Sequence, residues 1–179
     1  EKSRVTPIVE TSRLILRGRT MADFPAYAAM WAAREVARFT TVAPLKEEDA
    51  WIKFTRMEGV WALTGYGFWI VEEKATGAVI GEIGLADFKR DMTPSLAGMP
   101  EYGWVLAPAA HGKGYAREAV GSALVWGDQK FPGTTFCCII DPANTASVAV
   151  AEAHGFKRAL IAPYKGKDIA IFHRAPASS

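Results

Sequence analysis

The sequence predicts a single mixed α/β domain built from layers of strands and helices. Two observations support this fold class. Strand-like and helix-like apolar patterns alternate along the chain, and no linker, repeat or low-complexity segment divides its 179 residues. A chain of this length can also bury a sufficient apolar core without disulfides or metal ions. We therefore expect one domain over residues 1–179, with an ordered part from about 9 to 174 that contains seven strands and about four helices.

The first elements are defined by an alternating strand and two helix starts. Leu14 and Leu16 face one way in a short strand over 13–17. Asp23 then fits a helix N-cap, because Pro25 falls in the first turn, where a missing N–H does no harm. We expect that helix to end near residue 33, and a second helix with acidic residues at its start to cover 47–61.

The middle of the chain has strand character. Runs rich in β-formers cover 68–73 and 79–85, and the turn 74–77 between them indicates a hairpin. Residues 91–100 contain two prolines and no regular period, which indicates a surface loop. A strand over 102–106 follows this loop.

The last third alternates helix and strand. The expected elements are a helix over 113–129, a strand over 135–140, a helix over 144–154 and strands over 156–161 and 169–174. Gly155 follows the second helix directly and is typical of a left-handed helix stop.

The composition argues against two classes of partner. Half of the residues are apolar and 22% are charged, with 21 basic against 19 acidic side chains. The resulting net charge of +2 does not favour nucleic-acid binding. The longest uncharged stretch, 59–71, is shorter than the roughly 20 residues of a membrane-spanning helix. We expect neither nucleic acid nor a membrane as a partner.

The two cysteines, Cys137 and Cys138, are adjacent in the sequence. On a strand their side chains point to opposite faces, so we expect two reduced thiols rather than a disulfide. Reduced thiols, together with the lack of a secretory signal pattern, indicate a cytoplasmic protein. A monomer and a homodimer both remain open.

The loop 111–116 between a strand and a helix is the first candidate binding site. Gly112 and Gly114 allow the main chain to approach a ligand, and the first N–H groups of a helix have no internal partners. These groups suit a phosphate or pyrophosphate, although a plain turn with glycines for packing explains the same spacing. Tyr115 stands where a kinase-type loop needs Ser or Thr, and Arg117 stands where a dinucleotide fingerprint needs its third glycine.

A second candidate site opens the helix over 144–154. Asn144 is a good N-cap, and Ser147 lies at the third helical position. Both side chains share the first turn and could face one ligand. The alternative is purely local, with Asn144 capping the helix and Ser147 bonding back to its main chain.

Taken in order, these motifs resemble the GNAT acetyltransferase superfamily. The quoted segments are His-Gly-Lys-Gly-Tyr-Ala at 111–116, Asn-Thr-Ala-Ser at 144–147 and Glu-x-x-Gly-Phe at 152–156. The start of the chain, Glu10 to Arg17 followed by Asp23, is similar to the branch of ribosomal-protein-alanine N-acetyltransferases. The resemblance covers about residues 9–174. It implies acetyl-CoA as donor, an amine as acceptor, and a mostly antiparallel sheet splayed between the fourth and fifth strands, where the donor lies.

The resemblance also implies roles for single residues. The family signature Arg/Gln-x-x-Gly-x-Gly/Ala falls on 111–116, and His111 departs from it. It assigns the pyrophosphate to main-chain groups of the loop, namely Gly112, Lys113, Gly114, Tyr115 and Ala116. It assigns the pantetheine arm to the main chain of the preceding strand, namely Trp104, Val105, Leu106 and Ala107. Asn144 would hydrogen-bond that arm, and Ser147 would lie near the thioester sulfur.

Catalysis by such an enzyme needs a base for the amine and a route for the leaving thiolate. Glu101, at the start of the central strand, is our candidate base, with Glu82 as the alternative; either could instead be a solvated carboxylate. The family often has a proton-donating Tyr where this chain has Ala151. Ser147 or a water could substitute, or the thiolate could leave unaided. A main-chain N–H of the strand around Val105 would meet the oxyanion.

Alternatives remain open at this stage. Ala151 and His111 also fit a non-catalytic CoA-binding regulatory module, and the loop fits a nucleotide-binding domain. The three histidines lack metal-ligand spacing, so we expect no metal. The acceptor is a protein N-terminus or a small amine, and Phe39, Trp69 and Trp104 could line its pocket.

Overall fold

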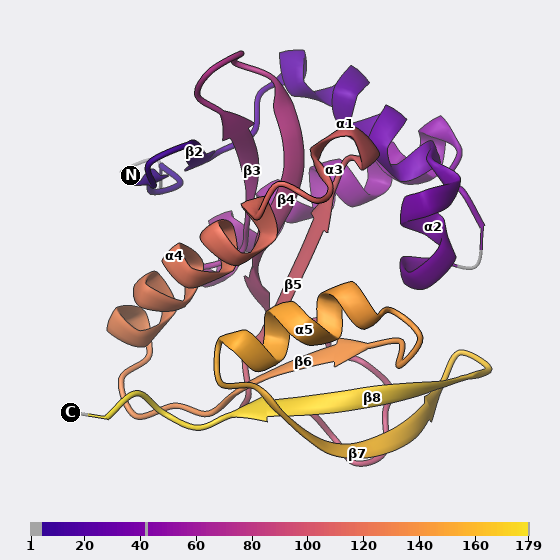
Figure 1. Ribbon diagram of the computed structural model, residues 1–179, viewed down its shortest axis with the longest axis vertical. Helices are drawn as coiled ribbons and strands as arrows, with labels where there is room; N and C mark the ends of the chain where they lie inside the picture. Colours follow the sequence, from indigo (N-terminus) through magenta and orange to yellow (C-terminus); the bar gives the residue numbers. More distant parts are fainter. Residues whose placement is uncertain (1–4, 42, 179) are drawn as a thin grey trace.

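The computed structural model of this protein describes residues 5–41 and 43–178. Its strands form one eight-stranded sheet in the order β1-β2-β3-β4-β5-β6-β8-β7 (Figure 1). The strands are β1 (Val9–Glu10), β2 (Leu14–Arg17), β3 (Phe68–Glu73), β4 (Val79–Ala86), β5 (Glu101–Leu106), β6 (Phe136–Ile140), β7 (Lys157–Tyr164) and β8 (Lys167–Arg174). The α-helices are α1 (Phe24–Ala32), α2 (Arg34–Thr40), α3 (Glu47–Thr64), α4 (Tyr115–Lys130) and α5 (Thr145–Ala153).

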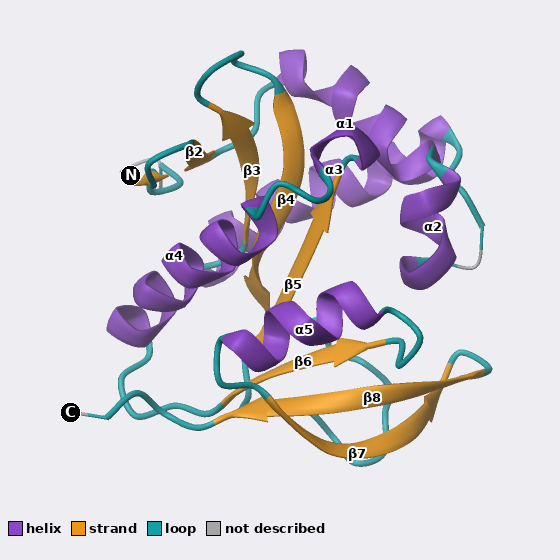
Figure 2. Ribbon diagram, viewed as in Figure 1, coloured by secondary structure: helices purple, strands orange, loops and turns teal. Residues whose placement is uncertain are grey.

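The sheet consists of two antiparallel halves that diverge at one point. Strands β1 to β5 pair antiparallel in sequence order, and β6, β8 and β7 form the second half. The halves meet where β5 and β6 run parallel, with Glu101 and Cys137 as their registered pair. Figure 2 shows the two strands spreading apart beyond that pair. The mixed, mostly antiparallel sheet and its splay are therefore confirmed.

Strand alternation divides the core between the two faces of the first half. Trp69 and Val71 of β3 belong to the main buried cluster, which also contains apolar residues of α4 and α5. Ile70, between them, packs into a second cluster with Tyr27 of α1 and Phe54 of α3. Helices α1 and α3 thus cover one face and α4 the other, because neighbouring side chains of a strand point to opposite sides.

One strand and one α-helix were not predicted. The sequence predicts seven strands, but the described chain has an eighth, β1, whose two residues are too few to show a period. The expected first helix also continues beyond residue 33 as a separate helix, α2. Ala33 is extended, with φ −72° and ψ 132°, and separates α2 from α1.

Two predicted helix starts need correction. The helix expected from residue 113 begins at Tyr115, because Gly114 is left-handed with φ 79°. Asp23 does precede α1, but its side chain makes no capping hydrogen bond to that helix. Its carboxylate instead accepts the Thr20 N–H at 2.7 Å and pairs with Arg17. The predicted Asn144 cap and Gly155 stop of α5 are confirmed.

Both cysteines are buried on β6 as free thiols, as predicted. In the described residues, no helix combines the length and the apolar character that crossing a bilayer requires. Nor do the described side chains include a cluster of three or more His, Cys, Asp or Glu residues suited to a metal ion.

Candidate functional site

The splay leaves one edge of β5 free to bind a ligand. The Cys137 N–H donates to the Pro100 carbonyl at 3.1 Å, at the last point where the two halves touch. On the other edge, the Ala107 N–H donates to the Ile80 carbonyl at 2.8 Å. This bond fixes the alternation of the antiparallel ladder, so the main-chain groups of Trp104 and Leu106 face the splay. An extended ligand could pair with them as an added strand.

His111 occupies part of this edge. Its Nε2 lies 2.9 Å from the Leu106 carbonyl oxygen, and because a carbonyl can only accept, Nε2 carries the proton. The bond ties the loop 111–116 to the end of β5. The side chain that departs from the family signature thus has a structural role at the free strand edge.

The loop after His111 exposes main-chain donors at the start of α4. Gly112 and Gly114 are left-handed, with φ 75° and 79°, and no side chain of residues 5–41 or 43–178 caps α4. The first N–H groups of α4 therefore have no helical partner and sit at the positive end of the helix dipole. This arrangement suits an anion such as a pyrophosphate.

Arg13, which the sequence analysis missed, holds the loop in place. Its guanidinium pairs with Glu118 at 2.7 Å and donates to the Lys113 carbonyl at 2.9 Å. It also stacks 4.3 Å from the centre of the Tyr115 ring, whose hydroxyl donates to Glu73. The Tyr115 side chain is thus bonded to the sheet, which leaves its main chain for a ligand.

Two hollows flank the splay, and they meet. The first, which we call the loop groove, has a volume of about 630 Å³ and lies between α2, the loop 111–116 and the start of α5. The second, which we call the broad cleft, has a volume of about 820 Å³ and extends across β4, β5, β6 and the β7–β8 turn. Six residues line both: Phe39, Thr40, Trp104, Val105, Asn144 and Ser147.

Asn144 and Ser147 stand at this junction because they open α5. The Asn144 Oδ1 accepts the Ser147 N–H at 3.3 Å, which is the N-cap bond. Both side chains are partly exposed and border both hollows. The N-cap bond therefore leaves both side chains at the border of the two hollows.

Most of the predicted donor-binding residues line the loop groove. They are Trp104, Val105, Leu106, His111, Gly112, Gly114, Tyr115, Ala116, Asn144 and Ser147. Two others do not line it. The Ala107 N–H is bonded to the Ile80 carbonyl, and the Lys113 carbonyl accepts from Arg13.

Glu101 faces the broad cleft from the start of β5 and is 5% exposed. Arg90 binds both of its oxygens, at 2.6 and 2.8 Å, and also donates to the Tyr164 hydroxyl at 3.1 Å. Burial raises the pKa of the Glu101 carboxyl, and the Arg90 guanidinium opposes that rise. The predicted strand-end position is correct, but the carboxylate is a buried ion pair rather than a solvated group.

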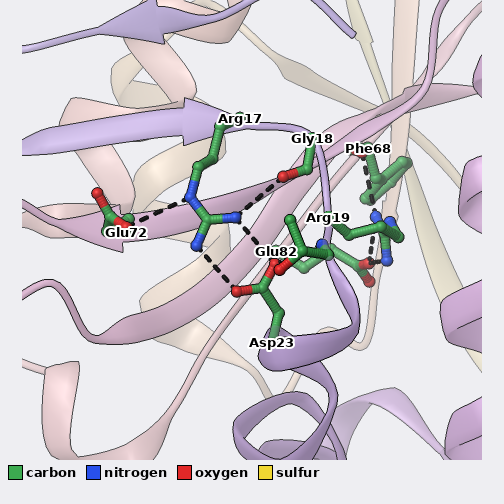
Figure 3. Close-up of polar contacts among 8 residues, drawn as sticks. Arg17, Gly18, Arg19, Asp23, Phe68, Glu72 and Glu82 are labelled. Carbon is green, nitrogen blue, oxygen red and sulfur yellow. Dashed lines mark hydrogen bonds and ion pairs between the residues drawn. The ribbon is translucent and has the colours of Figure 1, made fainter. Parts of the chain in front are cut away.

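Glu82 also lines the broad cleft and is 3% exposed. One oxygen accepts two bonds from Arg19, each 3.2 Å long (Figure 3). The other oxygen accepts the Tyr27 hydroxyl at 3.2 Å. Arg19 in turn donates to the Phe68 carbonyl. The sequence pattern gives no signal for Arg19 or Arg90, because both lie in irregular segments.

Two of the three aromatic residues considered for an acceptor pocket border a hollow. Phe39 and Trp104 line both hollows. Trp69 does not, because it is fully buried against Trp61 and Trp126. Its ring N–H donates to the Pro7 carbonyl at 2.9 Å, which makes it part of the core.

Comparison with known sequences supports one family. Residues 13–157 match the model of the acetyltransferase (GNAT) domain. The Bacillus subtilis protein YkkB is 32% identical over 112 residues, which cover 62% of this chain and 63% of YkkB, less than two thirds of its length. The uncharacterized N-acetyltransferase p20 of Bacillus licheniformis is 27% identical over 168 residues, 90% of this chain and 91% of p20.

Comparison with solved structures supports the same fold. A Bordetella pertussis protein assigned to the GNAT-family acetyltransferases has a TM-score of 0.83 at 27% identity, over 94% of this chain and 99% of its own. RimL, a ribosomal L7/L12 α-N-protein acetyltransferase solved with coenzyme A, has a TM-score of 0.76 at 15% identity, over 94% of this chain and 98% of its own. A phosphinothricin acetyltransferase of Sinorhizobium meliloti, solved with acetyl-CoA, has a TM-score of 0.67 at 23% identity, over 92% of this chain and 89% of its own. The last two likenesses concern the fold alone.

Proposed function

Because this chain belongs to the GNAT acetyltransferase family, we propose that it transfers an acetyl group from acetyl-CoA to a primary amine. We further propose that the amine attacks directly in a complex that holds both substrates. The observation that supports this is the junction of two hollows at Trp104, Asn144 and Ser147. A donor in one hollow and an acceptor in the other would meet there, and proximity of this kind lowers the barrier to reaction.

The loop groove fits acetyl-CoA in two respects. The N–H groups at the start of α4 are uncapped, as a pyrophosphate site requires. The free edge of β5 offers the main-chain groups of Trp104 and the Leu106 N–H to the amides of a pantetheine arm, while the Leu106 carbonyl is bonded to His111. When bound, acetyl-CoA supplies an acetyl group on a thioester, and every other contribution comes from this chain.

Glu101 is the proposed base on the acceptor side. An amine is mostly protonated at neutral pH and must lose a proton before it attacks. Burial raises the pKa of the Glu101 carboxyl and so narrows the gap between this pKa and that of an amine. A carboxylate with a raised pKa is a better proton acceptor. The two bonds from Arg90 occupy one lone pair on each oxygen and leave the others for an amine or a bridging water.

One group is proposed for the developing oxyanion and one for the neighbourhood of the leaving thiolate. The Trp104 N–H faces the splay and is the proposed donor to the oxyanion. Ser147 is the proposed neighbour of the thioester sulfur. It lies one helical turn before Ala151, which is buried in the main core cluster, so the serine is the polar side chain on that face of α5.

The test is release of free CoA thiol from acetyl-CoA in the presence of amines. The panel should contain short peptides with a free α-amine and small primary amines, with matched reactions that lack amine. We expect amine-dependent CoA release and an acetylated product of the corresponding mass. Acetyl-CoA binding without CoA release for any amine would contradict this function and support a non-catalytic CoA-binding module.

A further inference from the structure

The walls of the broad cleft carry an unusual number of charges. Ten charged side chains line it, six cationic and four anionic. The cations are Lys53, Arg56, Lys89, Arg90, Lys165 and Lys167, and the anions are Glu82, Asp91, Glu101 and Asp141. A cleft that receives a protonated amine alone should favour the opposite balance.

Most of these charges are already paired. The pairs are Arg90–Glu101 at 2.6 Å, Lys89–Asp87 at 2.8 Å, Arg19–Glu82 at 3.2 Å and Lys167–Asp141 at 3.9 Å. Among the described residues, Lys53, Arg56 and Lys165 have no carboxylate within ion-pair distance. Three cations therefore face the cleft without a counter-charge, against one exposed carboxylate, Asp91.

Two of the three cations are adjacent on one helix. Lys53 and Arg56 are three residues apart on α3 and so share one face of it. The Lys53 ammonium lies 4.5 Å from the centre of the Trp31 ring, and the Arg56 guanidinium lies 5.5 Å from that of Phe88. Aromatic faces hold a cation in place but do not neutralise it.

The third cation reaches the cleft from the other half of the sheet. Lys165 lies in the turn between β7 and β8, which is distant in sequence from α3. Figure 1 shows β7 and β8 in the second half of the sheet. Lys165 and Lys167 are exposed, and both border the broad cleft. Cations from both halves of the sheet thus converge on one volume.

We propose that the acceptor is a small amine that also bears an oxyanion, such as a carboxylate, and that Lys53, Arg56 and Lys165 bind this anion in the broad cleft. The proposal rests on the proposed acetyl transfer, because it names the acceptor class of that reaction. The same cations disfavour the ammonium form of the bound amine and so increase the fraction that can attack.

A direct binding test does not depend on turnover. The probes are glutarate, inorganic phosphate and, as the neutral match, glutaramide, titrated into the full chain with acetyl-CoA present. We expect saturable binding of an anionic probe, no binding of glutaramide, and at least tenfold weaker anion binding by the Lys53→Met/Arg56→Met double variant. Lys157→Met, an exposed lysine outside both hollows, is the control and should bind like the parent protein.

The binding test has clear contrary outcomes. If neither glutarate nor phosphate binds, or if both bind equally well to the double variant, the anion site does not exist. The Lys53→Met substitution should not destabilise the fold. Met keeps the side-chain length, and the substitution removes a desolvated cation that lacks a carboxylate partner.

The pH dependence of glutarate binding separates Lys53 from its neighbours. Burial lowers the pKa of Lys53, and repulsion by Arg56, Arg90 and Lys165 adds to this against the attraction of Glu82. Glutarate affinity should therefore fall as the pH rises through a value below the ordinary 10.5. Lys53→Arg should retain affinity over this range because arginine stays charged, whereas equal losses in both proteins would exclude Lys53 from the anion site.

Turnover gives the matching kinetic test. β-Alanine and 4-aminobutyrate should have kcat/KM values at least tenfold above those of their carboxamides, and the double variant should lose this preference through KM. Equal use of acids and amides would overturn the anion site while leaving acetyl transfer intact. Absence of CoA release with every amine would instead contradict the proposed function, and the glutarate titration would still decide the anion site.

Discussion

Gly114 is the residue on which the proposed pyrophosphate site depends most directly. Its φ of 79° is a conformation that β-branched side chains rarely adopt, and it precedes the first residue of α4. Gly114→Val should strain the loop and move the uncapped N–H groups, so we expect acetyl-CoA affinity to fall at least tenfold. Isothermal titration measures this change.

A second glycine separates local strain from the loss of a ligand site. Gly77 has φ 72° in the turn between β3 and β4 and lines neither hollow. Gly77→Val should lower stability by roughly 1–2 kcal/mol, as expected for a left-handed L residue, and leave acetyl-CoA affinity unchanged. Equal affinity in Gly114→Val and the parent protein would exclude the loop as the pyrophosphate site.

Glu101 gives the pH prediction. Burial raises the pKa of its carboxyl, and a base acts when ionised, so kcat should rise with pH through that raised pKa and then level off. Glu101→Gln should lower kcat by roughly 100-fold or more and flatten this limb. Glu58→Gln, an exposed residue of α3 outside both hollows, is the matched control.

Loss of the Arg90 partner must be distinguished from loss of a base in this experiment. Glu101→Gln leaves Arg90 without its carboxylate, so thermal stability and acetyl-CoA affinity should be measured beside the rates. A variant that keeps the parent pH profile, whatever its absolute rate, would show that another group accepts the proton. Glu82→Gln is then the next variant to examine.

At the residue scale, sequence reasoning located main-chain positions better than side-chain partners. The loop glycines and the Asn144 cap follow from spacing and known local preferences. The partners of Glu101 and Glu82 do not, because Arg90 and Arg19 lie in irregular segments whose side chains are positioned by tertiary contacts.

At the element scale, α4 rests on β5 through a position that has no room for a methyl group. A Cβ on Gly127 would lie 1.9 Å from the Tyr102 hydroxyl, which donates to the Ala123 carbonyl at 3.0 Å. Gly127→Ala should therefore destabilise the fold by roughly 1–3 kcal/mol through overpacking. Denaturant unfolding measures this loss.

Gly59 in α3 is the helix control for that prediction. Outside the neighbouring backbone of α3, a Cβ there meets no atom of the described residues within 4 Å, so Gly59→Ala gains helix propensity without a clash. We expect it to stabilise the fold by up to about 1 kcal/mol. If Gly127→Ala were as stable as Gly59→Ala, the close contact between α4 and β5 would be wrong.

The elements that the sequence predicted well are those with a strong period. The expected strand over 68–73 and the start of the helix at 47 coincide with β3 and α3. α2 was missed because its break from α1 depends on the extended Ala33, which no residue type at that position signals. This matters for function, since Phe39 and Thr40 of α2 line both hollows.

At the scale of the whole molecule, the splay is the feature on which the account depends. One registered pair, Glu101 with Cys137, joins the halves of the sheet, and both hollows open beyond it. The family resemblance implied this splay, but the apolar pattern of β5 and β6 does not show which strand edges remain unpaired. The two hollows share lining residues from α2, β5 and the start of α5, which are far apart in the sequence.

The most direct test of the central claim is titration with acetyl-CoA followed by thermal unfolding, with NAD and ATP as controls. A ligand at a hundredfold excess over its Kd stabilises the folded state by about 2.7 kcal/mol. For a chain of this size, the melting temperature should rise by roughly 5–10 °C with acetyl-CoA and stay unchanged with NAD or ATP. No rise with acetyl-CoA, or an equal rise with the nucleotides, would contradict a donor site in the splay between β5 and β6.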